Sequence, residues 1–289
     1  MPYADPFASF KIPGLGAAVK PLFGDYLGYT ILPDHVEEVI FAAFFYHAIY
    51  LVSSIVSPRL VKGYNSLSRR TQLNFDIHVV SHVQAILILA LSFPLFGDAD
   101  LAKDRIYSYT PYAGFVSAMA VGYFVWDTYI CIRYFKMFGL GFAIHGIGAL
   151  FVFLQSMRPL LLSYSPHFLL FELSTPFLNV NWFASHLPEG SISFGVQKIN
   201  GLFLMATFFS TRIIWGFYQA FSVVSDLFFG AADYVPVHPL WASIGVCASN
   251  LALDVLNVYW FYKMVLLAKR ALASGSGSAT SAQKKKKDQ

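Results

Sequence analysis

Charged residues are too scarce in this sequence for a soluble protein of its size. Only 12% of the 289 residues are Asp, Glu, Lys or Arg, whereas 56% are apolar and 18% are aromatic. Soluble domains carry about 25% charged residues. The mean hydropathy of +0.55 points the same way. The composition excludes an ordinary cytosolic enzyme, a disordered chain and a fibre, and it predicts an all-α protein that crosses a membrane several times.

Cysteine is also scarce, and the excess of positive over negative residues is small. The two cysteines, Cys131 and Cys247, lie inside apolar runs, which excludes a disulfide framework and a cysteine metal site. The net charge of +4 does not indicate nucleic-acid binding, because four of the twenty basic residues form the run 284–287 and most others flank apolar segments. We therefore expect neither a nucleic-acid partner nor a bound metal.

Long apolar segments provide the membrane spans. A helix needs about 20 mostly apolar residues to cross a bilayer. Seven segments meet this requirement: 36–57, 76–96, 111–133, 138–157, 160–182, 199–222 and 240–268. The fifth is the weakest, since it contains Pro166, Glu172 and Pro176, and we expect it to be broken or partly buried inside protein.

Basic residues set the orientation of these spans. They gather after the first span (Arg59 to Arg70), after the third (Arg133 and Lys136) and after the last (Lys269 onward). Seven spans put all three groups on one side, and positive residues mark the cytosolic side. The N-terminus is then lumenal and the C-terminus cytosolic.

This orientation divides the chain into four parts. Residues 1–34, broken by five prolines and lacking a signal-peptide pattern, form a lumenal or interfacial segment. Residues 35–69 hold the first span and its basic loop, and 70–270 hold the remaining spans. Residues 271–289 form a flexible cytosolic tail that ends in a lysine run. Lys286 and Lys287 resemble the dilysine retrieval signal of endoplasmic-reticulum membrane proteins, which coat machinery binds; contact of the run with anionic lipid is the alternative.

Polar residues inside the spans mark the candidate site, because a charge at mid-bilayer costs at least about 2.5–3.5 kcal/mol. His78 and His82 share one helical face in the second span. Asp127 and His145 lie on consecutive spans, where a carboxylate could orient an imidazole for catalysis or simply join two helices. The remaining candidates for the lining of a polar cavity are Trp126, Glu172, Asn179, Arg212, Asp254 and Asn257. An ion pair between Glu172 and Arg212 is a structural alternative.

Four stretches carry a resemblance to a known family: residues 74–82, 122–127, 171–182 and 256–263. In this order they resemble the TLC domain family, which includes ceramide synthases and translocation-associated membrane proteins. The Glu-Leu-Ser-Thr-Pro-Phe stretch at 172–177 looks most like the TLC-domain-containing proteins of fungi and animals. The resemblance implies that spans two to seven form a six-helix bundle around a central lipid-sized cavity.

The resemblance leaves two main hypotheses for function. The preferred one is an endoplasmic-reticulum protein, without cofactor, that binds, senses or redistributes a phospholipid or sphingolipid for lipid homeostasis. The alternative is a ceramide-synthase-like N-acyltransferase that uses acyl-CoA, with His145 as base or acyl acceptor and Asp127 as its partner. Of the synthase His-His pair only His145 is matched, since Gly146 follows it. A cargo-escort role ranks third, and the glycines around the fourth span also suit a homodimer.

Overall fold

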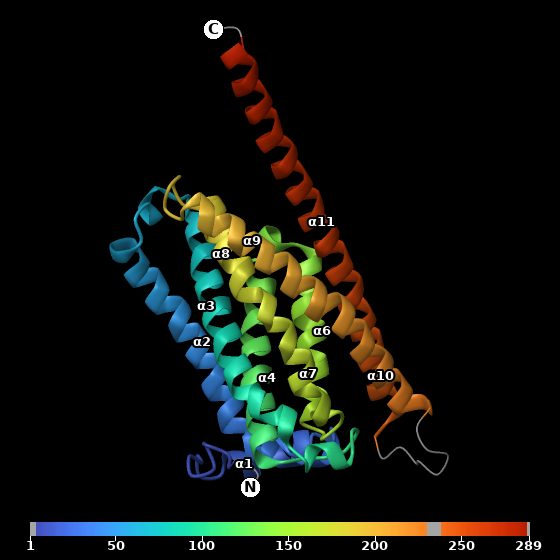
Figure 1. Cartoon of the computed structure of the whole chain (residues 1–289). Coiled ribbons are helices and arrows are strands. Elements are labelled where there is room, and N and C mark those ends of the chain that lie inside the picture. The colour runs from blue at the N-terminus through green and yellow to red at the C-terminus, as the bar shows by residue number, and fades with distance from the viewer. Residues whose placement is uncertain (1–3, 230–237, 288–289) are drawn as a thin grey trace.

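The computed structural model describes residues 4–229 and 238–287, with side chains as far as residue 270. All regular structure in these ranges is helical, as predicted. The α-helices are α1 (Leu15–Val19), α2 (Leu32–Leu60), α3 (Arg69–Ser92), α4 (Pro111–Arg133), α5 (Phe135–Phe138), α6 (Leu140–Ser156), α7 (Ser165–Leu169), α8 (Thr175–His186), α9 (Phe194–Phe208), α10 (Gly216–Phe229) and α11 (Leu240–Lys287). Figure 1 shows the longer helices packed side by side in one bundle, with α11 projecting beyond it.

Five helical stretches are long and apolar enough to cross a membrane: Leu32–Leu60, Arg69–Gly97, Pro111–Arg133, Phe194–Phe229 and Leu240–Arg270. They contain five of the seven predicted spans, so the multi-pass membrane character is supported. The predicted span 138–157 corresponds to α6, which is apolar but shorter. The predicted span 160–182 corresponds to α7, α8 and the 3-10 segments Leu162–Tyr164 and Leu170–Ser174.

The two prolines explain the irregular helix between residues 162 and 186. Pro166 lies in the first turn of α7 and Pro176 in the first turn of α8. Proline has no N–H to donate, so it is tolerated in a first turn and disrupts the helix before it. The chain accordingly changes to a 3-10 helix over Leu170–Ser174, directly ahead of Pro176. We expect this span to be broken or partly buried, and the structure shows α-helical pieces joined through 3-10 turns.

Helix α4 lies between α2, α3 and α6 and is the most deeply buried of the long helices (Figure 1). Its crossing with α2 depends on glycine. A Cβ on Gly122 would lie 2.5 Å from both the Ala42 Cβ and the Val39 carbonyl oxygen. Only glycine permits this separation between the helices, because any side chain would push the α2 backbone away.

Helix α3 begins before the second predicted span, which starts at Asp76. The helix begins two turns earlier, because the Ser68 hydroxyl accepts a hydrogen bond from the Thr71 amide (3.2 Å) and caps it. Asp76 lies within α3, buried, and accepts hydrogen bonds from the Ser53 hydroxyl (2.6 Å) and the Tyr64 hydroxyl (2.8 Å). It therefore joins α3 to α2 and to the connecting loop.

The C-terminal residues extend the last helix. Helix α11 includes residues 271–287, the region assigned above to a flexible tail. The side chains of this stretch, including those of Lys286 and Lys287, lie outside the described residues. The tail and its retrieval signal stay predictions.

Candidate functional site

A cavity of about 590 Å³ lies within the half of the bundle where α3 begins and α4 ends. Its walls come from α3, α4, α5, α6, α8, α9, α11 and the two irregular segments Leu170–Ser174 and Phe209–Trp215. Small-molecule sites in proteins enclose about 300–1,000 Å³. Six of the residues singled out by the sequence line it: His78, Asp127, His145, Glu172, Asn179 and Arg212.

Four other candidates do not line the cavity. Trp126 is buried and stacks on Tyr123, with ring centroids 6.1 Å apart. Trp126 lies on a different face of α4 from Asp127, because successive residues of an α-helix are rotated by about 100° about its axis. His82 lies one turn beyond His78 along α3 and outside the lined stretch. Asp254 and Asn257 are buried on α11, but the α11 lining begins only at Trp260.

A polar cluster joins α3 to α8 at the wall of the cavity. His78 Nδ1 lies 2.6 Å from the Asn179 Oδ1, and the Asn179 amide donates to the Ser81 hydroxyl at 3.2 Å. Asn179 is fully buried. These bonds satisfy polar groups that would otherwise destabilise the apolar interior.

An aromatic stack continues this wall toward the surface. The His78 ring stacks on Trp182 at 4.3 Å, and Trp182 stacks in turn on His186 at 4.1 Å. His186 is exposed, as are the lining residues Arg70 and Lys263. The cavity thus reaches the surface at an end that carries two permanent positive charges.

Arg212 joins the two irregular helical segments. Its Nε donates to the Phe171 carbonyl oxygen (3.2 Å) and to the Ser174 hydroxyl (3.0 Å), and its Nη2 donates to the Thr175 hydroxyl (3.2 Å). A 3-10 turn leaves carbonyl oxygens such as that of Phe171 available to a side-chain donor. The guanidinium also contacts Asn257 Oδ1 at 3.5 Å.

Glu172 is not the ion-pair partner of Arg212 in the described part of the chain, where no carboxylate oxygen lies within 4 Å of that guanidinium. The alternative raised for this pair therefore finds no direct contact. Glu172 lines the cavity, half-buried. Its carboxylate and the Arg212 guanidinium both remain beside the same space, and neither neutralises the other through a contact.

Asp127 and His145 face the cavity from α4 and α6, whose close approach depends on Gly146. A Cβ on Gly146 would lie 3.1 Å from the Asp127 Oδ2. His145 contacts the Trp260 ring edge-on, with centroids 5.6 Å apart and planes at 66°. No hydrogen bond joins His145 to Asp127 among the residues that the structure describes. The two groups share the cavity, but the predicted direct pairing is not seen.

Sequence reasoning missed several lining residues. Arg70 served only to orient the spans, and Tyr123 and His186 were not singled out. A signal existed for Tyr123, because it precedes Asp127 by four residues and so shares its helical face. The same spacing applies to His186, which follows Trp182 by four residues and stacks on it.

Comparisons with known proteins find one matching family and several similar proteins. The TLC domain family matches residues 74–266. An uncharacterized TLC domain-containing protein of Schizosaccharomyces pombe is 39% identical, with 87% of this chain and 84% of that protein covered. Topoisomerase I damage affected protein 4 of Saccharomyces cerevisiae is 35% identical, covering 83% and 87%. TLC domain-containing protein 4 of Homo sapiens is 33% identical, covering 78% and 83%. No solved structure matches.

Proposed function

The chain belongs to the TLC domain family, in the branch of TLC-domain-containing proteins of fungi and animals that its sequence predicted, and from this we propose that it binds a membrane lipid in the cavity described above. The ligand is a phospholipid or sphingolipid, and the protein binds, senses or redistributes it for lipid homeostasis. The proposal includes seven membrane spans and residence in the endoplasmic reticulum with a cytosolic C-terminus.

The observation that carries the proposal is the polar composition of the cavity lining. Polar groups from several helices, among them His78, Asp127, His145 and Arg212, line a cavity of about 590 Å³ inside an apolar bundle. Such groups are costly in a membrane and are retained where they serve a ligand or a water-filled space. Lining residues such as Ile77, Phe142 and Met264 supply apolar surface to the same cavity.

The surface end of the cavity suits the headgroup of a phospholipid. Arg70 and Lys263 are exposed cations at its surface end and would bind the phosphate of a phospholipid headgroup. Arg70 already donates to the Met137 carbonyl oxygen at 3.2 Å, which holds its guanidinium at this position. The mouth then faces the side that the basic loops identify as cytosolic.

A photoreactive phospholipid, incorporated into membranes that contain the full chain, tests the proposal. We expect crosslinks on cavity residues of α4 such as Ile130 and Cys131. Phe44 and Ile55 lie exposed on α2 and provide the control surface, since any membrane-facing helix would acquire some label there. Labelling of α2 with none on the α4 wall would contradict a lipid in the cavity.

The acyltransferase remains the second candidate, because His145 and Asp127 line the same cavity. A neutral imidazole could remove a proton from an amine acceptor or accept an acyl group from acyl-CoA. Incubation with long-chain acyl-CoA and a sphingoid base should then give an N-acyl product with the wild type and none with His145→Ala. Absence of product from the wild type, together with lipid crosslinks in the cavity, would leave binding as the function.

Location in the endoplasmic reticulum is tested through the tail. Lys286→Ser together with Lys287→Ser removes the dilysine pattern recognised by coat machinery. We expect the variant to leave the endoplasmic reticulum, whereas Lys284→Ser with Lys285→Ser should not, although it removes equal charge. Equal distributions of the two variants would favour a lipid contact of the whole lysine run.

The molecular mass of the purified protein in detergent tests the homodimer.

A further inference from the structure

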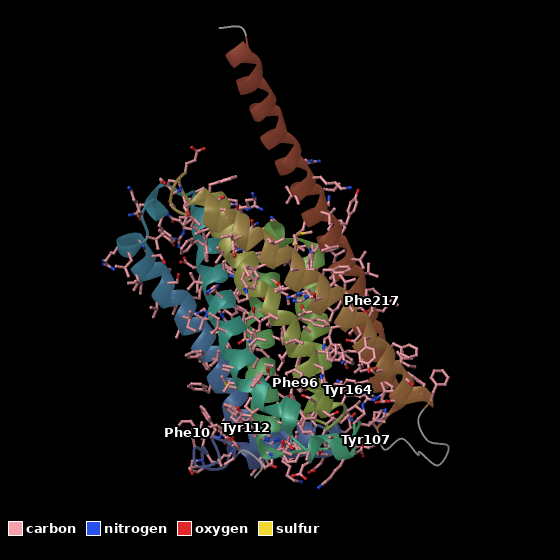
Figure 2. The ribbon with its side chains drawn as sticks, in the orientation of Figure 1. Phe10, Phe96, Tyr107, Tyr112, Tyr164 and Phe217 are labelled. Atoms are coloured by element: carbon pink, nitrogen blue, oxygen red, sulfur yellow. The ribbon has the colours of Figure 1, made fainter. Side chains whose placement is uncertain are left out.

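A second cluster of ionisable side chains lies at the opposite end of the bundle from the cavity mouth. Figure 2 places Phe10 and Tyr112 at this end, near the N-terminus. His35 and Glu38 lie in the first turns of α2 and are buried, and Asp5 belongs to the N-terminal segment that covers them. Phe7 secures this cover, since its ring packs on Phe41 at 4.9 Å.

Three of these side chains present ligand atoms to one space. A nitrogen of His35 and a carboxylate oxygen each from Asp5 and Glu38 lie within 4.8 Å of one another. His35 Nδ1 is 2.6 Å from the Glu38 Oε2. His35 Nε2 is 2.9 Å from the Tyr109 hydroxyl. With a metal bound between Nδ1 and the carboxylates, Nε2 would donate its hydrogen to the Tyr109 hydroxyl, as the second nitrogen of a metal-ligating histidine does.

Unsatisfied oxygens give independent support for a ligand. Glu38 Oε1 and Glu37 Oε2 are buried and have no hydrogen-bond partner in the described structure. The Lys11 ammonium lies 3.7 Å from each of these two oxygens, and its Nζ donates instead to the Asp34 carbonyl oxygen. Among the described residues, Lys11 is thus the one ammonium that faces the carboxylates of Glu37 and Glu38, and buried negative charge needs compensation.

We propose that Asp5, His35 and Glu38 bind a divalent transition-metal ion, with Zn²⁺ as the best fit. One imidazole nitrogen with carboxylate oxygens suits zinc, whereas magnesium and calcium prefer oxygen alone. Zinc ligands lie about 2.0–2.2 Å from the ion and so about 3.3 Å from each other. His35 and Glu38 would separate slightly, and the half-buried Asp5 would move inward. The ion would fasten the N-terminal segment to α2.

Sequence spacing does not indicate this site, because Asp5 lies 30 residues before His35 and the three ligands follow no metal-binding pattern. The cluster is also independent of the lipid proposal, since none of its residues lines the cavity. A failure here leaves the lipid function untouched, and the reverse also holds.

Zinc content of the full chain, purified in detergent without a metal-binding tag, tests the proposal. After exposure to Zn²⁺ and dialysis, we expect about one zinc per wild-type chain and a higher Tm than in EDTA. Asp5→Asn should weaken zinc binding at least about tenfold, the scale of loss seen when a metal site is disturbed. Asp25→Asn is the matched control, because Asp25 lies in the same N-terminal segment but is exposed and pairs with Lys20 at 2.7 Å.

Glu38→Gln adds a second variant, and its Tm in EDTA shows whether it folds. Zinc bound equally by wild type, Asp5→Asn and Asp25→Asn would overturn the proposal. Wild type without zinc and with an unchanged Tm would overturn it as well, and His35 and Glu38 would then form a plain hydrogen-bonded pair.

Discussion

Asn179 connects α8 to α3 through two hydrogen bonds, so its replacement tests how the cavity wall is held. Asn179→Leu keeps the volume and removes the bonds to His78 and Ser81. Each bond contributes about 0.5–1.5 kcal/mol, which gives a loss of about 2 kcal/mol for both. In a chain of this size that loss lowers Tm by about 4–8 °C.

Asn181→Leu is the matched control, because Asn181 lies on the same helix, is exposed and has no side-chain hydrogen bond to any described residue. Exposed substitutions change stability by about 0.5 kcal/mol or less. Thermal unfolding of both variants in the same detergent gives the comparison. His78 should also react faster with diethyl pyrocarbonate in Asn179→Leu, since the ring loses its partner. Equal Tm values for the two variants would refute the assignment of this cluster as a structural join.

Two further predictions concern packing and the α2–α3 loop. Gly122→Val should prevent folding or lower Tm strongly, because its Cβ would lie 2.5 Å from the α2 backbone. Gly201→Val is the control and should fold normally, because no atom lies within 4 Å of a Cβ at that position. Equal expression of folded protein for the two variants would contradict the packing argument. Tyr64→Phe should cost about 1–3 kcal/mol by removing the hydroxyl bound to Asp76, while Tyr262→Phe should be neutral. Burial and the Asp76 hydrogen bond raise the pKa of Tyr64, so this contribution is present below the ordinary tyrosine value of about 10 and is lost as pH rises above it. A Tyr64→Phe penalty that grew at alkaline pH would contradict the sign.

Much of the fold could be predicted from sequence because apolar segments in a membrane must be helical. Charge scarcity identified the class, and five predicted spans lie within long apolar helices. The start of α3 was missed because the Ser68 cap precedes the apolar run by two turns. The 3-10 segment Leu170–Ser174 was anticipated only as a break, since proline positions reveal where an α-helix fails and not what replaces it.

The sequence predicts which residues line the site, but it does not predict which atoms they contact. The free-energy cost of placing polar side chains in a membrane identifies His78, Asp127, His145 and Arg212 as candidates. All four line the cavity. Their partners depended on helix phase and irregular backbone, which sequence spacing does not report. Arg212 thus binds the 3-10 segment through Phe171 and neighbouring hydroxyls, where an ion pair with Glu172 had been considered.

Native mass spectrometry of the full chain, gently released from detergent, tests the central claim most directly. We predict a wild-type mass that exceeds the sequence mass by one phospholipid or sphingolipid per chain. Cys131→Phe places a ring into the cavity and should lose this lipid, whereas Cys247→Phe, outside the cavity lining, should keep it. A wild type without bound lipid, or lipid retained equally by both folded variants, would contradict a lipid-binding cavity.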